Sequence, residues 1–157
     1  MFAQTFNSIH HYDFTPEEVF PLLCPVREKD WIDGWDYEMV YSRSGLVEKD
    51  CIFTTPFGQG IETTWYVSEY EPKLFFIEFV RVTQGLFTVR ISIHLSEAKK
   101  GATADIAYRY TALSKLGKTM IESMVAQHFH EDMKYWEKAL NHYLATGKML
   151  LKEPVES

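Results

Sequence analysis

The stretch SKLGKTMIESMVAQHFHEDMKYWEKALNHYLATG, residues 114–147, decides the fold. It contains no proline, it starts at Ser114, a residue type that caps helix N-termini, and it ends at Gly147, a common helix stop. We therefore predict one helix over this stretch, which at ~1.5 Å per residue would be about 50 Å long. At about 100° per residue, its apolar stripe comprises Ile121, Val125, Phe129, Trp136, Ala139 and Tyr143. The opposite side carries Ser123, Gln127, His130, Lys134, Glu137, Asn141 and Lys148.

Two polar residues, His128 and Asp132, interrupt this apolar stripe. They are four positions apart, so their side chains share one face of the helix. Burial of such groups without partners costs several kcal/mol, so we expect them to face a cavity or to satisfy each other. Two interpretations stay open: a polar anchor or acid–base pair inside a pocket, and a structural pair at a wet cavity edge.

The chain before the helix is predicted to be mostly strands. Residues 2–14 alternate as a strand, Thr15 and Glu18 form a capping box for a short helix, and Pro25 starts another short turn or helix. Six further strands are predicted near residues 36–43, 47–55, 61–70, 74–83, 86–97 and 102–112. Their short connections imply antiparallel neighbours. Period-two alternation predicts that one face of the sheet is covered, and the long helix is the element able to cover it.

This order of elements resembles the START-like superfamily, which includes pollen allergens, polyketide cyclases and lipid-transfer domains and is sometimes grouped as SRPBCC. The run PLLCPVREKDWIDGW, residues 21–35, is similar to the corresponding segment of bacterial members. The resemblance spans essentially the whole chain. It implies an α+β helix-grip fold, in which a seven-stranded curved antiparallel sheet surrounds the C-terminal helix in the order β-α-α-β6-α. It also implies one ligand-binding domain over residues 1–157, with a tail at 148–157, and no shared catalytic residue.

The same resemblance implies a cavity for a small hydrophobic or amphipathic ligand between sheet and helix. Strand alternation supplies candidate lining residues on the helix-facing side, although aromatic residues at this spacing are also typical of plain core. Tyrosine hydroxyls and an indole N–H on that face need hydrogen-bond partners, which a polar ligand or water supplies. The predicted pocket residues are Met39, Tyr41, Phe53, Trp65, Phe79, Ile91, Tyr108, Tyr110, His128 and Asp132.

Composition limits the classes of function. The chain has 157 residues, 46% of them hydrophobic, which argues against disorder, and its net charge of −6 provides no basic surface for nucleic acid. The two cysteines, Cys24 and Cys51, have no metal-ligand spacing, so we expect neither a disulfide framework nor a metal, no cofactor is implied, and a reducing cytoplasm is the expected setting. No apolar run is long enough to span a membrane. The oligomeric state is left open.

Three functions are compatible with these patterns. The first is the binding of a lipid-, polyketide- or aromatic-like molecule. The second is an enzyme of the cyclase or dehydratase type, in which His128 and Asp132 transfer protons. The third is a protein-interaction module, which an exposed apolar patch without an enclosed cavity would favour.

Overall fold

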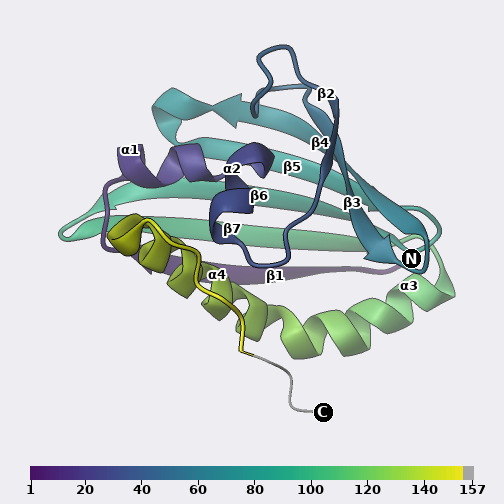
Figure 1. Ribbon diagram of the computed structural model, residues 1–157. Helices are drawn as coiled ribbons and strands as arrows, with labels where there is room; N and C mark the ends of the chain where they lie inside the picture. The colour runs from purple at the N-terminus through teal and green to yellow at the C-terminus, as the bar shows by residue number, and fades with distance from the viewer. Residues whose placement is uncertain (154–157) are drawn as a thin grey trace.

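A computed structural model describes residues 1–153 and gives the element order shown in Figure 1. The strands are β1 (Ala3–Tyr12), β2 (Glu38–Tyr41), β3 (Ile52–Gly58), β4 (Ile61–Glu71), β5 (Phe76–Thr83), β6 (Phe87–Ala98) and β7 (Gly101–Ala112). The helices are α1 (Pro16–Val19), η1 (Phe20–Leu22), α2 (Pro25–Trp31), η2 (Pro72–Leu74), α3 (Lys115–Met120), η3 (Ile121–Val125) and α4 (Ala126–Thr146). The order is the predicted one.

The seven strands form one antiparallel sheet in the order β1-β7-β6-β5-β4-β3-β2. The first strand pairs with the last, and the others form a meander. Figure 1 shows α1, α2 and the long helix on the same side of the sheet. The predicted helix-grip architecture is therefore confirmed: one face of the sheet is covered by helices and the other is open.

The predicted strand at 47–55 is wrong in its limits, because β3 begins at Ile52 and continues to Gly58. The carboxylate of Glu48 accepts hydrogen bonds from the hydroxyls of Ser42 and Ser44, and these hold residues 42–48 in a loop. Asp50 then has a φ of 71°, in the left-handed region, which interrupts extended backbone. The β3–β4 turn is correspondingly tight, with positive φ at Gln59 and Gly60.

The long helix is continuous from Lys115 to Thr146, as predicted. The Ser114 hydroxyl accepts a hydrogen bond from the Gly117 N–H at 3.0 Å, and Gly147 ends the helix with a φ of 72°. One turn, η3, is a π-helix rather than an α-helix. A π turn holds an extra residue, so it rotates all later side chains relative to a uniform α-helical pattern. Beyond η3 the buried positions are Phe129, Met133, Ala139 and Leu140.

Two side chains from the predicted polar side of the helix close the free edge of β1. The carboxylate of Glu137 accepts a hydrogen bond from the His11 N–H at 2.7 Å. The amide of Asn141 accepts one from the Asp13 N–H and donates one to the His11 carbonyl. These bonds satisfy backbone groups that an edge strand would otherwise present to solvent, and they fix the helix along the strand.

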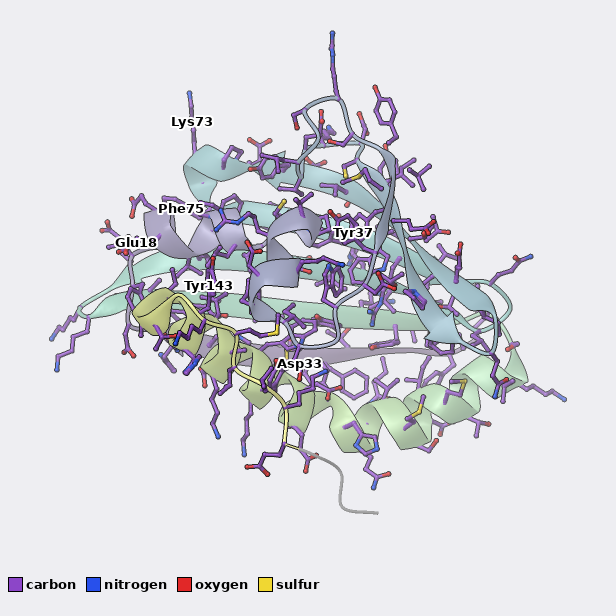
Figure 2. The ribbon with its side chains drawn as sticks, in the orientation of Figure 1. Glu18, Asp33, Tyr37, Lys73, Phe75 and Tyr143 are labelled. Carbon is purple, nitrogen blue, oxygen red and sulfur yellow. The ribbon has the colours of Figure 1, made fainter. Side chains whose placement is uncertain are left out.

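Hydrogen bonds join the short helices to each other and hold the segment after the long helix. The indole N–H of Trp31 donates to the Leu22 carbonyl at 3.0 Å, which joins η1 and α2. Of the predicted tail 148–157, residues 154–157 lie outside the described residues, and the preceding segment packs back on α2 and α4. The Leu150 carbonyl accepts from the Tyr135 hydroxyl, and the Lys152 N–H donates to the Asp33 carboxylate, whose position Figure 2 marks. No helix in the described part of the chain is both long and apolar enough to cross a membrane.

Gly117 provides a test of how tightly α3 is held against the sheet. A Cβ atom at this position would lie 1.7 Å from the Leu86 carbonyl oxygen, which already accepts a hydrogen bond from the Leu113 N–H. Intrinsic propensity predicts that Gly117→Ala stabilises the helix by about 1 kcal/mol. We expect destabilisation instead, by roughly 2 kcal/mol or more, because the backbone at Leu86 or in α3 would have to move to make room for the methyl group. Urea unfolding measures this, with the exposed Thr119→Ala as the control; a stabilised Gly117→Ala would contradict the packing.

Candidate functional site

A cavity of about 410 Å³ lies between the sheet and the long helix. The sheet side of its wall consists of Phe57, Arg81, Phe87, Tyr108 and Tyr110. The helix side consists of Met124, Val125, His128, Phe129, Asp132, Met133 and Trp136, which belong to η3 and the first turns of α4. The wall is therefore mainly aromatic and aliphatic, with a few polar atoms, as is typical of small-molecule sites.

Aromatic rings of the wall pack against one another and against β1. The Phe129 ring lies 5.3 Å from both Phe6 and Tyr108, centroid to centroid, and Phe87 lies 5.4 Å from Tyr110. A second groove, of about 460 Å³, continues from the cavity between the β3–β4 hairpin and α3. Phe57 and Met124 line both spaces.

The predicted pocket residues divide into three groups. Tyr108, Tyr110, His128 and Asp132 line the cavity. Phe53, Trp65, Phe79 and Ile91 do not line it and are buried in the core, where Phe53 stacks on Trp65 at 5.2 Å. Met39 is partly buried against the same core, and Tyr41 is 55% exposed. For the second group the plain-core interpretation of strand aromatics describes the structure better than the pocket interpretation does.

The prediction that Tyr41 faces the interior is wrong, and a β-bulge explains why. Met39 is opposite Phe53, whose side chain is buried, but the register then shifts, and Tyr41 is opposite Ile52. Residues that are directly paired point to the same face of a sheet. Tyr41 therefore lies with Ile52 on the outer face, where simple alternation along one strand places it inside.

His128 and Asp132 reach the cavity, but they are exposed rather than buried in the apolar stripe. The π turn explains this correction, because it rotates the stripe toward Met133 and Leu140 and moves both polar residues to its edge. No hydrogen bond joins their side chains within residues 1–153. Loss of hydration raises the pKa of the Asp132 carboxyl, while the nearby His128 and Lys152 side chains lower it. They form the polar mouth of the cavity.

Arg81 is a wall residue that we did not single out from the sequence. It lies on the covered face of β5, opposite Trp65 on β4 and Val89 on β6. One Nη donates to the Tyr110 hydroxyl at 3.1 Å, and the guanidinium carbon lies 5.0 Å from the centroid of Trp65 and 5.8 Å from that of Tyr108. The signal was in the pattern: Arg81 is two residues after the inward Phe79, so alternation places it inside.

Glu28 is a second residue that we did not single out, and it has no sequence signal, since charged residues on short helices are usually at the surface. Its side chain is partly buried on α2, and loss of hydration raises the pKa of its carboxyl to about 8. Burial raises the pKa of Tyr108, Arg81 lowers it, and the charges of Glu28 and Asp132 raise it further.

The cysteines contribute to packing. Cys24 and Cys51 are buried and free, and burial raises the pKa of the Cys51 thiol to about 11, which makes it a poor nucleophile at neutral pH. Within the described residues, no three His, Cys, Asp or Glu side chains come together as they would around a metal ion.

The Glu28 carboxyl predicts how stability depends on pH. In the unfolded chain it ionises near its usual pKa of 4.5, but in the folded protein it keeps its proton up to about pH 8. The unfolded state therefore releases a proton first, so stability falls as pH rises through this window and levels off above it. We expect Glu28→Gln to remove this loss and to be more stable than wild type at pH 9, on the order of 2 kcal/mol. Urea unfolding at pH 5, 7 and 9 measures the difference, and parallel pH curves for both proteins would contradict it.

Comparisons with known proteins agree with this fold. No protein-family model matches the sequence, and no curated protein matches it either. Among solved structures, Ara h 8.0201 has a TM-score of 0.70 at 13% identity over 92% of this chain and 99% of its own. Norcoclaurine synthase from Thalictrum flavum, in complex with dopamine and hydroxybenzaldehyde, has a TM-score of 0.68 at 10% identity over 94% of this chain and 89% of its own.

A third similar structure is DynU16, a protein from the dynemicin biosynthetic locus. Its TM-score is 0.63 at 18% identity, and the match covers 92% of this chain but 48% of that one. At these identities the likeness establishes the fold and nothing finer. The chain has the helix-grip fold that these three structures share.

Proposed function

We propose that this protein binds a small amphipathic molecule in the cavity between the sheet and the long helix. The observation that carries the proposal is the cavity itself: about 410 Å³, with an aromatic wall and polar atoms from Arg81, Tyr108 and Tyr110 on one side. This volume and composition suit a molecule with one or two rings or a short acyl chain. Support also comes from similar solved structures, one of which holds dopamine and hydroxybenzaldehyde.

The proposed ligand contacts are the four predicted residues that line the cavity, Tyr108, Tyr110, His128 and Asp132, together with Arg81. The tyrosines lie on the sheet side, and His128 and Asp132 lie at the mouth. An apolar body would pack against Phe129 and Trp136 while a polar end meets the charged side chains. We propose one ligand-binding domain over the chain on the same grounds.

Proton transfer by His128 and Asp132 has weaker support. An acid–base pair needs each group within hydrogen-bond reach of its partner or of the substrate, and it is helped by a shifted pKa. His128 and Asp132 make no hydrogen bond to each other within the described chain, and both are exposed. An interaction module is also less well supported, because an apolar cavity is present.

The cavity can be tested by filling it. We expect Val125→Trp to place an indole inside and to weaken binding of the neutral fluorescent dye N-phenylnaphthylamine at least about tenfold, since a bulky side chain excludes the ligand. Ala126→Trp is the matched control, because Ala126 is the next residue, is exposed and does not line the cavity. Dye fluorescence titration measures both. Equal affinity for the two variants, or no dye binding to wild type, would refute the proposed function.

The mouth residues give a second test. His128→Ala and Asp132→Ala should each change the free energy of unfolding by less than about 0.5 kcal/mol, because both side chains are exposed. If they contact the ligand, each substitution weakens dye binding or changes its pH dependence. Paired urea unfolding and dye titrations separate the two effects; a large loss of stability with unchanged binding would assign both residues to the structure alone.

A further inference from the structure

The guanidinium of Arg81 is a positive charge inside an aromatic wall without a carboxylate partner. The ion pairs in residues 1–153 join Arg27 to Asp30, Lys49 to Glu69 and Lys118 to Glu122, and none involves Arg81. Its hydrogen bond to the Tyr110 hydroxyl uses one Nη, so its remaining N–H groups have no protein acceptor in that part of the chain. The side chain is partly buried, where an unmatched charge is costly.

Nearby acidic groups do not neutralise this charge. Asp132, the one carboxylate in the cavity wall, is exposed at the mouth and forms no ion pair with Arg81 within residues 1–153. Glu28 lies near enough to influence the Tyr108 hydroxyl, but burial keeps its carboxyl protonated at neutral pH. A ligand that reaches the sheet side of the cavity therefore meets a net positive charge.

The aromatic neighbours hold the guanidinium in a defined position. Arg81 lies between Trp65 and Tyr108, with its guanidinium carbon 5.0 Å and 5.8 Å from the two ring centroids. The hydroxyl of Tyr110, on β7, accepts a hydrogen bond from one of its Nη atoms. A planar guanidinium fixed in this way presents its free N–H groups as a fork, the geometry that suits a carboxylate. Little side-chain freedom is lost when an anion binds, which favours recognition.

We infer that the ligand of this cavity is an amphipathic anion, an aromatic or short aliphatic carboxylate whose acid group pairs with Arg81. Its apolar body packs between the sheet and α4. This inference rests on the proposed function, since it names the chemical class of the molecule that the same cavity holds. The inference goes beyond the proposed function because it assigns the specificity for the ligand to one residue, Arg81, rather than to the predicted pair His128 and Asp132.

The experiment compares two molecules with the same ring system. Naphthaleneacetate carries a carboxylate, and naphthaleneethanol replaces it with a hydroxyl; each is titrated against bound N-phenylnaphthylamine at pH 7 in the full chain. We expect wild type to prefer the carboxylate by roughly tenfold or more, since a hydrogen bond to a charged group contributes more than one between neutral groups. Added salt should reduce the preference, whereas binding of the alcohol should hardly change.

Three variants assign the effect. Arg81→Gln should lose the preference while binding the alcohol within about threefold of wild type, and Arg81→Lys, which keeps the charge without the fork, should retain part of it. Arg90→Gln is the matched control, because Arg90 is exposed on the neighbouring strand β6 and does not line the cavity. Urea unfolding shows whether each variant is folded. If Arg81→Gln does not fold, the inference is tested by the carboxylate preference of wild type and by its reduction in Arg81→Lys.

The outcomes separate this inference from the proposed function. If neither compound displaces the dye, or the dye itself does not bind, the cavity is not a ligand site and both fail. If both compounds bind equally well to wild type, or Arg81→Gln weakens both by the same factor, the cavity binds ligand but Arg81 does not select an anion. A carboxylate preference that survives in Arg81→Gln would also overturn the inference.

Discussion

The packing of Phe129 between the sheet and the rest of the long helix is the interaction on which this structure depends. Its ring lies 5.3 Å, centroid to centroid, from both Phe6 on β1 and Tyr108 on β7. One side chain therefore joins the helix to two paired strands. Those strands are the first and the last of the seven, so their pairing joins the two ends of the sheet-forming part of the chain. The same ring is part of the cavity wall, so the element that holds the fold together also shapes the site.

A single π turn sets which residues of the long helix face the sheet. Because η3 rotates the following residues, Phe129 and Met133 turn toward the sheet while His128 and Asp132 move to the mouth. The hydrogen bonds of Glu137 and Asn141 with the β1 backbone then fix the remaining turns. The helix is held firmly at its ends, by Gly117 against Leu86 and by the contacts with β1, and the cavity lies between these attachments.

The sequence predicts most of the fold because the relevant signals are local. Thr15, Ser114 and Gly147 act through hydrogen bonds and backbone angles within a few residues, and strand alternation follows from the pleat alone. The site was predicted less well because it depends on small departures from regularity. A bulge between Met39 and Tyr41 reverses the face of Tyr41, and a π turn displaces His128 and Asp132; neither has a recognisable local signal. Arg81 could have been found from alternation, whereas Glu28 depends on how α2 packs.

The central claim is that ligand enters between the sheet and the helix around Phe129. An NMR titration of isotope-labelled protein with N-phenylnaphthylamine tests it most directly, because it reports every residue at once. We expect the largest shift changes at Val125, Phe129, Tyr108 and Tyr110, with small changes on the outer face of the sheet at residues such as Arg90. Changes centred instead on exposed apolar residues away from the cavity, such as Leu46 and Leu74, would contradict the claim.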